Sequence, residues 1–135
     1  LAIASKNHQV VCLDGDSAAI MHLGALAVNG VVGISNFTHI ILNNGAHESV
    51  GGQDSVGLKI NFTGIAKNIG FATAKGQIRT KEEFLGALNE FKGIGNAKFL
   101  DIQIRKGMRH DMPILRFHQI ETKVSLMHWI ARSEH

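Results

Sequence analysis

The chain has 135 residues, of which 44% are hydrophobic and 19% charged, and its formal net charge is +3. This composition is typical of a single globular domain and excludes a disordered chain. No apolar run approaches the roughly 18 residues of a membrane span, and no secretory signal pattern is visible. The modest basic excess lacks the interleaved aromatic residues of single-strand nucleic-acid binders. We therefore expect a cytoplasmic protein with neither a membrane nor a nucleic-acid partner.

Two short apolar runs near the start, residues 9–13 and 38–42, predict a pair of buried parallel strands. Between them, residues 18–28 repeat apolar side chains at helical spacing, which predicts one crossover helix. Cys12, the only cysteine, lies in the first run, and we expect it to be a buried small hydrophobe. A strand, a crossover helix and a second strand bring both strand ends to the same edge of one sheet.

Oxygen-bearing side chains follow both runs, with Asp16 just after the first and Asn44 just after the second. We expect these two side chains to meet in space. Magnesium prefers hard oxygen ligands, commonly one or two from protein, with phosphate oxygens and water completing its shell. Ser17 and Ala18 would open the helix, so that free backbone N–H groups point at an anion, and Gly15 would let the backbone come close to it. The pattern predicts a magnesium–diphosphate site.

The rest of the chain alternates between predicted helices and strands. In chain order these are a glycine-rich loop over residues 45–57, a helix over 62–69 capped by Asn61 and stopped at Gly70, a strand over 71–74, a helix from the capping box at 80–83, a strand over 98–104 and a helix over 121–132. Their alternation predicts an α/β fold with a doubly wound, mostly parallel sheet and helices on both faces. Ligands of such sheets bind beyond the carboxyl ends of the strands.

Apolar spacing also predicts which helix residues face the core. These are Phe62, Ile65, Ala66 and Ile69 in the first of the later helices, Phe84, Leu85, Leu88 and Phe91 in the second, and a stripe of Val124, Met127 and Ala131 in the last. The opening residues 1–5 have the composition of a helix end.

At the predicted site the sequence resembles the thiamine-diphosphate-dependent enzymes. Their motif is usually GDG, a span of about this length, and then NN; here GDS stands at 15–17 and NN at 43–44. The resemblance implies that Asp16 and Asn44 hold magnesium through their side chains, with the backbone carbonyl of Ala46 as a third ligand. Serine replaces the usual third glycine of the motif. Because serine is small and favours helix starts, we expect it to be tolerated or to bond the diphosphate itself.

The neighbouring segments LDGDSAAIMHLGALAVNG and HIILNNGAHESVGGQ narrow the resemblance to the phosphonopyruvate decarboxylases, with the sulfopyruvate decarboxylases next. This resemblance implies decarboxylation of a 2-oxo acid with an anionic tail, most simply phosphonopyruvate to phosphonoacetaldehyde and CO2. The cofactors implied are thiamine diphosphate, which acts as the electron sink, and Mg2+. The alternative is a sulfopyruvate decarboxylase subunit that holds the cofactor diphosphate for a partner chain.

Enzymes of this kind pair a pyrophosphate-binding domain with a pyrimidine-binding domain that carries an activating glutamate. By this resemblance, residues 1–135 correspond to the C-terminal part of the pyrophosphate-binding domain, and the pyrimidine-binding domain is absent from the chain. The isolated chain is therefore expected to be inactive. A homo- or hetero-oligomer that brings the two domains together is implied.

Several other polar residues have more than one interpretation. His47 and Glu48 lie where a substrate would approach the cofactor, and they could either transfer protons or fix the loop. We expect Asp14 to be structural and Asn43 to hold the turn rather than the metal. The basic cluster at residues 105–110 reads as a solvated loop or as a contact for an anionic substrate.

A rival hypothesis comes from the segment VVCLDGDSA, which resembles the first motif of haloacid-dehalogenase-like phosphatases. In that family Asp14 would be the nucleophile and Asp16 the acid–base. That pattern expects Thr or Val where this chain has Ala18, and it needs a later acidic pair that the sequence does not provide. The thiamine-diphosphate interpretation is therefore preferred.

Overall fold

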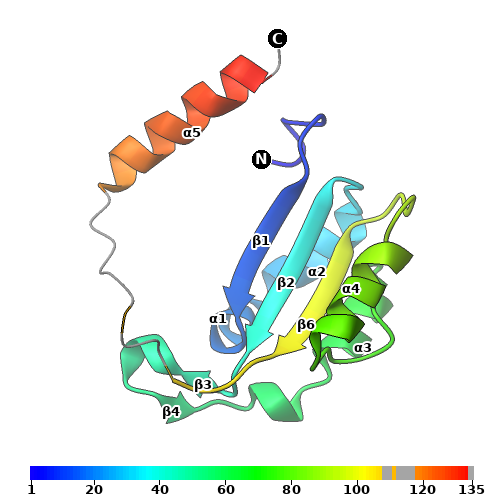
Figure 1. The fold of residues 1–135 in the computed structure, drawn as a ribbon, viewed down its shortest axis with the longest axis vertical. Helices are drawn as coiled ribbons and strands as arrows, with labels where there is room; N and C mark the ends of the chain where they lie inside the picture. Colours follow the sequence, from blue (N-terminus) through cyan, green and yellow to red (C-terminus); the bar gives the residue numbers. More distant parts are fainter. Residues whose placement is uncertain (108–110, 112–117, 134–135) are drawn as a thin grey trace.

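The computed structural model describes residues 1–107, 111 and 118–133. Its main sheet has the strand order β1-β2-β6-β5, and each neighbouring pair is parallel (Figure 1). The strands are β1 (Val10–Gly15), β2 (Phe37–Asn43), β6 (Lys98–Gln103) and β5 (Ala72–Thr73). The predicted parallel pairing of the first two apolar runs is confirmed.

Helices cover both faces of this sheet. The helices α1 (Asp16–Met21), α2 (Leu23–Val32) and α3 (Phe62–Asn68) pack on one face, and α4 (Lys81–Glu90) packs on the other. The first core contains Ala19, Leu26, Ile41, Phe62, Ala66, Phe71, Ala97 and Phe99. The second contains Ile40, Ala74, Ile78, Ala87, Phe91 and Leu100. A parallel sheet with helices on both faces is the doubly wound α/β architecture that the sequence predicted. The prediction of burial was wrong for β1, because no helix covers Val11 and Leu13 in the described part of the chain, and they are 55% and 64% exposed.

The crossover between β1 and β2 consists of two helices rather than the one predicted over residues 18–28. The break is at His22, whose backbone angles (φ −122°, ψ 33°) are not helical. Gly24, a poor helix former, lies two residues further on in the first turn of α2 and weakens the helix next to the break. The helix α2 then continues further than predicted and ends at Gly33, which is left-handed with φ 63°.

Two helix starts confirm their predicted caps. The Asn61 side chain accepts a hydrogen bond from the Gly64 N–H (2.8 Å) at the start of α3. In α4, the Thr80 hydroxyl accepts from the Glu83 N–H (3.1 Å) while the Glu83 carboxylate accepts from the Thr80 N–H (3.1 Å), which is a capping box.

The predicted inward face of α4 was partly wrong. Leu85 and Leu88 are 48% and 39% exposed, whereas Ala87 is 5% exposed and packs in the core. The stripe that faces the sheet runs through Phe84, Ala87 and Phe91, at spacings of three and four residues. Among the described residues, α4 is the one α-helix on this face, so the leucines on its flanks have no second described helix to pack against.

The carboxyl edge of the sheet is covered by a small antiparallel hairpin of β3 (Ala46–His47) and β4 (Gln53–Asp54), seen below β1 and β2 in Figure 1. The hairpin lies within the glycine-rich loop predicted over residues 45–57. A 3-10 turn, Glu48–Val50, joins the two strands, and a second one, Gly57–Lys59, follows them. The hairpin therefore stands over the strand ends where the site was predicted.

The last helix, α5 (Gln119–Ser133), lies apart from the sheet in Figure 1. Its predicted stripe is exposed, with Val124 at 43% and Met127 at 57%. The Trp129 ring lies 4.9 Å from the His8 ring, measured between centroids. Among the described helices, none has the length and apolar character needed to cross a membrane. At the other end of the chain, residues 1–5 form a turn rather than a helix end.

Candidate metal–diphosphate site

A cavity of about 300 Å³ opens at the carboxyl ends of β1 and β2. The two strands are parallel and end side by side, with Gly15 opposite Leu42. Every residue predicted for the site lines this cavity: Gly15, Asp16, Ser17, Ala18, Asn44, Ala46, His47 and Glu48. The structure thus brings together side chains from the two motif halves, as the strand–helix–strand argument predicted.

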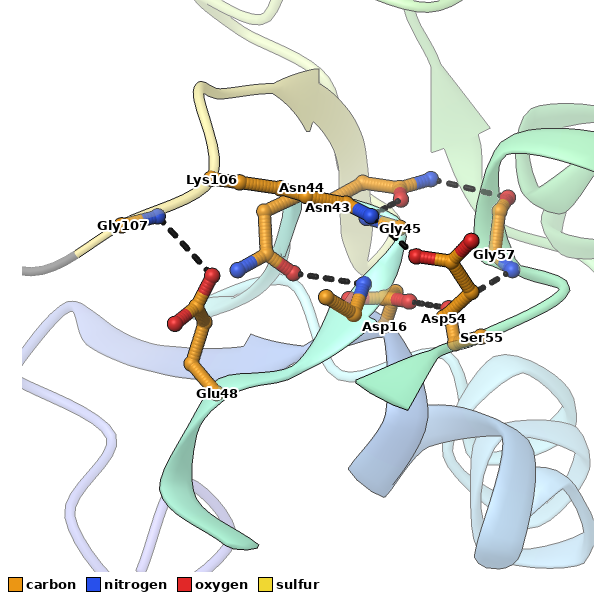
Figure 2. A network of polar contacts seen from close by, with 11 residues as sticks. Asp16, Asn43, Asn44, Gly45, Glu48, Asp54, Ser55, Gly57, Lys106 and Gly107 are labelled. Atoms are coloured by element: carbon orange, nitrogen blue, oxygen red, sulfur yellow. Dashed lines mark hydrogen bonds and ion pairs between the residues drawn. The ribbon is translucent and has the colours of Figure 1, made fainter. Parts of the chain in front are cut away.

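Asp16 begins α1 directly after β1 and is only 1% exposed. Its Oδ2 accepts a hydrogen bond from the Ser55 hydroxyl (Figure 2). The backbone of Gly57 packs against the same carboxylate, since a Cβ at Gly57 would lie 2.7 Å from both Cβ and Cγ of Asp16. The loop after β4 therefore fixes the orientation of the Asp16 carboxylate. Sequence reasoning missed Ser55, because a serine in a glycine-rich loop carries no distinctive pattern.

The two asparagines at the end of β2, Asn43 and Asn44, have different roles. Asn43 is fully buried, and its Oδ1 accepts from the Gly45 N–H (3.2 Å) while its Nδ2 donates to the Gly57 carbonyl (3.0 Å). This is the turn-holding role that the sequence favoured for it. Asn44 faces the cavity, and its Oδ1 accepts from the Ala46 N–H (3.0 Å). A carbonyl oxygen has two lone pairs, so this atom can keep that bond and still coordinate a cation.

The surroundings of the Ser17 side chain indicate that the cavity suits an anion. Its side chain is 7% exposed, and in the described part of the chain its hydroxyl has no hydrogen-bond partner. A buried hydroxyl without a partner costs free energy and calls for an explanation. The hydroxyl lies on the wall of the same cavity as the Asp16 carboxylate. An oxygen-rich anion held by a cation would satisfy both groups, so the residues present fit a magnesium diphosphate.

Asp101 was not singled out from the sequence, although it lies beneath the site. It comes from β6, is 2% exposed, and accepts hydrogen bonds from Asn43 Nδ2 (3.3 Å) and Gln77 Nε2 (3.0 Å). Burial raises the pKa of this carboxyl, the two hydrogen bonds lower it, and the charge of Asp16 raises it further. A carboxylate inside the apolar run KFLDIQI was the available signal.

The loop after β6 ties down the hairpin. Glu48 Oε1 accepts from the Gly107 N–H (2.8 Å), and Lys106 forms an ion pair with Asp54 (Figure 2). The hydrogen bond from Lys106 is the main cause that lowers the pKa of the Asp54 carboxyl. Of the predicted basic cluster at 105–110, residues 108–110 lie outside the described residues, and Arg105 is exposed.

Asp14 faces away from this network and toward His39, with 3.6 Å between Asp14 Oδ2 and His39 Nε2. Burial lowers the pKa of His39, and Asp14 opposes that shift. Cys12, in the same strand, is half-buried rather than buried, and burial raises its pKa. Among the described residues, no group of three or more His, Cys, Asp or Glu side chains could hold a metal ion. A metal at this edge would therefore depend on one carboxylate together with amide, backbone and ligand oxygens.

Comparison with known proteins decides the family. Residues 1–102 match the family described as thiamine pyrophosphate enzyme, C-terminal TPP binding domain. The chain belongs to this family. This assignment replaces the phosphatase alternative, in which Asp14 would have been a nucleophile.

Similar proteins in this family carry decarboxylase names. The chain is 37% identical over 62 residues to phosphonopyruvate decarboxylase of Streptomyces viridochromogenes, which covers 46% of the chain and 16% of that protein. It is 39% identical over 62 residues to the protein of the same name from Streptomyces hygroscopicus, with the same coverage. It is 34% identical over 87 residues to sulfopyruvate decarboxylase subunit beta of Methanocaldococcus jannaschii, which covers 62% of the chain and 46% of that subunit. The chain thus matches less than half the length of each of these relatives.

Proposed function

We propose that this thiamine pyrophosphate domain holds the cofactor diphosphate through Mg2+ in an enzyme that decarboxylates a 2-oxo acid with an anionic tail. The observation that carries the proposal is one cavity lined by the buried Asp16 carboxylate, the Asn44 amide and the Ser17 hydroxyl, which has no hydrogen-bond partner among the described residues. The favoured substrate is phosphonopyruvate, which would yield phosphonoacetaldehyde and CO2. The names of two similar proteins support this choice.

Each residue predicted to hold the metal or the diphosphate has an assigned role in this proposal. Asp16 supplies the charged ligand to Mg2+, and Asn44 Oδ1 and the Ala46 carbonyl supply neutral ones. Ser17 would donate a hydrogen bond from its hydroxyl to a diphosphate oxygen, and Gly15 and Ala18, at and just after the start of α1, would let the backbone approach the same group. When bound, thiamine diphosphate supplies the electron sink that takes up the electron pair left as CO2 departs.

His47 and Glu48 line the same cavity but differ in their contacts. Glu48 is held by the Gly107 N–H (2.8 Å), which favours the loop-fixing role for it. His47 is the better candidate for moving a proton at the substrate, because an imidazole can act both as a proton donor and as a proton acceptor. In the proposal, Glu48 orders the hairpin and His47 would hold or deliver the proton at the substrate.

A second candidate is a sulfopyruvate decarboxylase subunit that holds the diphosphate for a partner chain. The match to a beta subunit favours it, because that match covers 62% of this chain. Phosphonate and sulfonate tails are both tetrahedral oxyanions, so the cavity described here does not separate them. Rates of CO2 release from the assembled enzyme with each substrate, measured side by side, decide between the two.

Either enzyme needs a pyrimidine-binding part, which we propose covers the exposed apolar surface of α2. Val28 and Val31 on α2 are 62% and 79% exposed. A helix that is apolar on all sides is normally covered. In the assembled protein, Val31→Glu should reduce the assembly seen by analytical ultracentrifugation, and Leu85→Glu on α4 serves as the control. Equal assembly of the two variants would contradict this interface.

The test of the metal role is Asp16→Ala in the assembled protein. Calorimetric titration with thiamine diphosphate should lose its Mg2+-dependent binding, while circular dichroism shows an unchanged fold. Asn44→Ala should weaken binding less, because it removes a neutral ligand rather than a charge. Unchanged affinity in Asp16→Ala would refute the assignment, and a larger loss in Asn44→Ala would reverse the ranking of the ligands.

A further inference from the structure

A second buried carboxylate lies behind the candidate site and outside the roles assigned above. Asp101 comes from the central strand β6 and is 2% exposed. A buried carboxylate is costly unless it is well hydrogen-bonded. Both of its oxygens are used, Oδ1 by Asn43 Nδ2 (3.3 Å) and Oδ2 by Gln77 Nε2 (3.0 Å). It forms part of the polar network that reaches the cavity.

The bond from Asn43 to Asp101 determines which way the Asn43 amide points. The Asp101 carboxylate, in its ionised form, and the Gly57 carbonyl can only accept hydrogen bonds, so both require the NH2 end of that amide. The Asn43 oxygen is then left to accept from the Gly45 N–H (3.2 Å). Without Asp101, one of the two requirements on the amide orientation is lost.

Asn43 in turn connects to both candidate metal ligands. Through the Gly45 N–H it closes the turn that carries Asn44. Through the Gly57 carbonyl it fixes the backbone that packs on Asp16, and the Gly57 N–H donates to Ser55 Oγ (3.0 Å), whose hydroxyl donates to Asp16 (Figure 2). A continuous chain of polar contacts therefore runs from Asp101 to Asp16.

We propose that Asp101 is a positioning residue for the metal–diphosphate site, acting through Asn43 on the Asn44 turn and on the Gly57 backbone beside Asp16. This inference rests on the proposed function. Residues that orient metal ligands typically change metal affinity by roughly 10–100-fold when they are replaced. Asp101 is thereby given the role of aligning the two ligands before the cation arrives.

The experiment compares Asp101→Leu with Asp101→Asn in the assembled protein. Leucine keeps the volume and removes the acceptor. Asparagine keeps an oxygen for Asn43, and the half-buried Gln77 can turn its own amide to match the new NH2 group. If Asp101→Leu does not fold, Asp101→Val, which suits a strand, replaces it. Calorimetry gives the affinity for thiamine diphosphate at a series of Mg2+ concentrations.

We expect Asp101→Leu to raise the Mg2+ concentration at half-saturation by roughly 10–100-fold, and Asp101→Asn to stay close to wild type. Asn36→Ala, which removes hydrogen bonds at the opposite end of β2, is the control for lost stability and should leave the Mg2+ requirement unchanged. Adding Asp101→Leu to Asn43→Ala should cause no further loss, because Asp101 acts through Asn43.

The outcomes separate the two proposals. If the wild-type protein shows no Mg2+-dependent binding of thiamine diphosphate, the proposed function fails. If wild type binds and Asp101→Leu binds equally well, the positioning role is overturned. An Asp101→Asn loss as large as that of Asp101→Leu would also overturn it, because the hydrogen bond to Asn43 would then not be the cause.

Discussion

The two ends of strand β2 are each closed by a buried asparagine, and the contrast between them separates structure from function. Asn36 precedes the strand, is 6% exposed, and directs its Nδ2 at the carbonyls of Ala2, Ser5 and His8 (3.1, 2.9 and 2.8 Å). Asn43 ends the strand, is fully buried, and binds one carbonyl, one N–H and one carboxylate.

At the amino end, the acceptors of the Asn36 bonds are backbone carbonyls that need only a donor. At the carboxyl end lie the buried carboxylates of Asp16 and Asp101 and the Ser17 hydroxyl, which has no hydrogen-bond partner in the described part of the chain. Buried carboxylates and hydroxyls lower the free energy of unfolding unless a cation or hydrogen-bond partners satisfy them. We infer that the amino end contributes folding stability and that the carboxyl end gives up stability to keep a ligand site ready.

The variant with the largest expected effect on the carboxyl end of β2 is Gly57→Ala. A Cβ there would lie 2.7 Å from Cβ and Cγ of Asp16, so the carboxylate or the loop must move. We expect the Mg2+-dependent affinity for thiamine diphosphate to fall by roughly 100-fold, at the upper end of the effects seen for residues that support metal ligands. Calorimetry of the assembled protein measures this loss.

The matched control is Gly86→Ala in α4, where no atom lies within 4 Å of the added Cβ. Alanine is the better helix former, so this variant should be stabilised by about 0.5–1 kcal/mol without a change in cofactor affinity. If Gly57→Ala bound thiamine diphosphate with the same affinity as Gly86→Ala, the packing of Gly57 on Asp16 would not contribute to cofactor binding.

At the amino end, Asn36→Ala should show the opposite profile. It leaves buried carbonyls without their donor, which costs about 1–3 kcal/mol of unfolding free energy. Chemical denaturation of wild type and variant gives the difference, and cofactor affinity should be unchanged wherever the variant is folded. A fall in affinity comparable to that of Gly57→Ala would remove the distinction between the two ends.

Much of the fold could be predicted because its signals are local. The apolar runs that became β1 and β2, the Asn61 cap and the capping box of Thr80 and Glu83 depend on neighbouring residues alone. The break at His22 was missed because one non-helical residue leaves the apolar spacing over residues 18–28 unchanged. Leu85 was misplaced for a tertiary reason, since the number of helices on a face decides how wide an apolar stripe is covered.

For the site, the predicted sheet topology indicated which residues lie close together, which the sequence spacing of the motif alone does not. Parallel strands with a crossover helix place Asp16 and Asn44 at one edge, and both line one cavity. Ser55 and Asp101 could not be predicted in this way. Their contacts with Asp16 and Asn43 join residues 39 and 58 positions apart, and neither pair forms a motif. Contacts of this kind become visible only once the loop is folded over the strand ends.

Ser17→Ala sharpens the claim that the carboxyl end keeps unsatisfied groups for a ligand. Removing a buried hydroxyl without a partner should leave the stability of the cofactor-free protein equal or higher, whereas loss of its bond to the diphosphate weakens binding. A neutral hydrogen bond of about 0.5–1.5 kcal/mol corresponds to roughly 2–13-fold in affinity. Differential scanning calorimetry with and without the cofactor measures both effects. Reduced stability of the free protein would show that the hydroxyl has a structural partner.

The smallest expected effect lies midway along β2, at His39. This side chain is 6% exposed, and burial lowers its pKa below the ordinary 6.5 even though Asp14 opposes the shift. The unfolded chain therefore binds a proton at this histidine more readily than the folded one. Its contribution to stability is fully present above about pH 6.5 and is lost as the pH falls from that value toward the lower folded pKa.

His39→Leu tests this sign. Between pH 8 and pH 5.5, the melting temperature of wild type should fall more than that of His39→Leu, because the other histidines titrate in both proteins. The leucine packs between Phe37 and Phe99, whose rings lie 6.1 and 5.9 Å from the histidine ring, so the fold is kept. A wild-type melting temperature that falls less than that of the variant would mean that Asp14 outweighs burial. His39 would then belong with the charged groups of the carboxyl end rather than with the core.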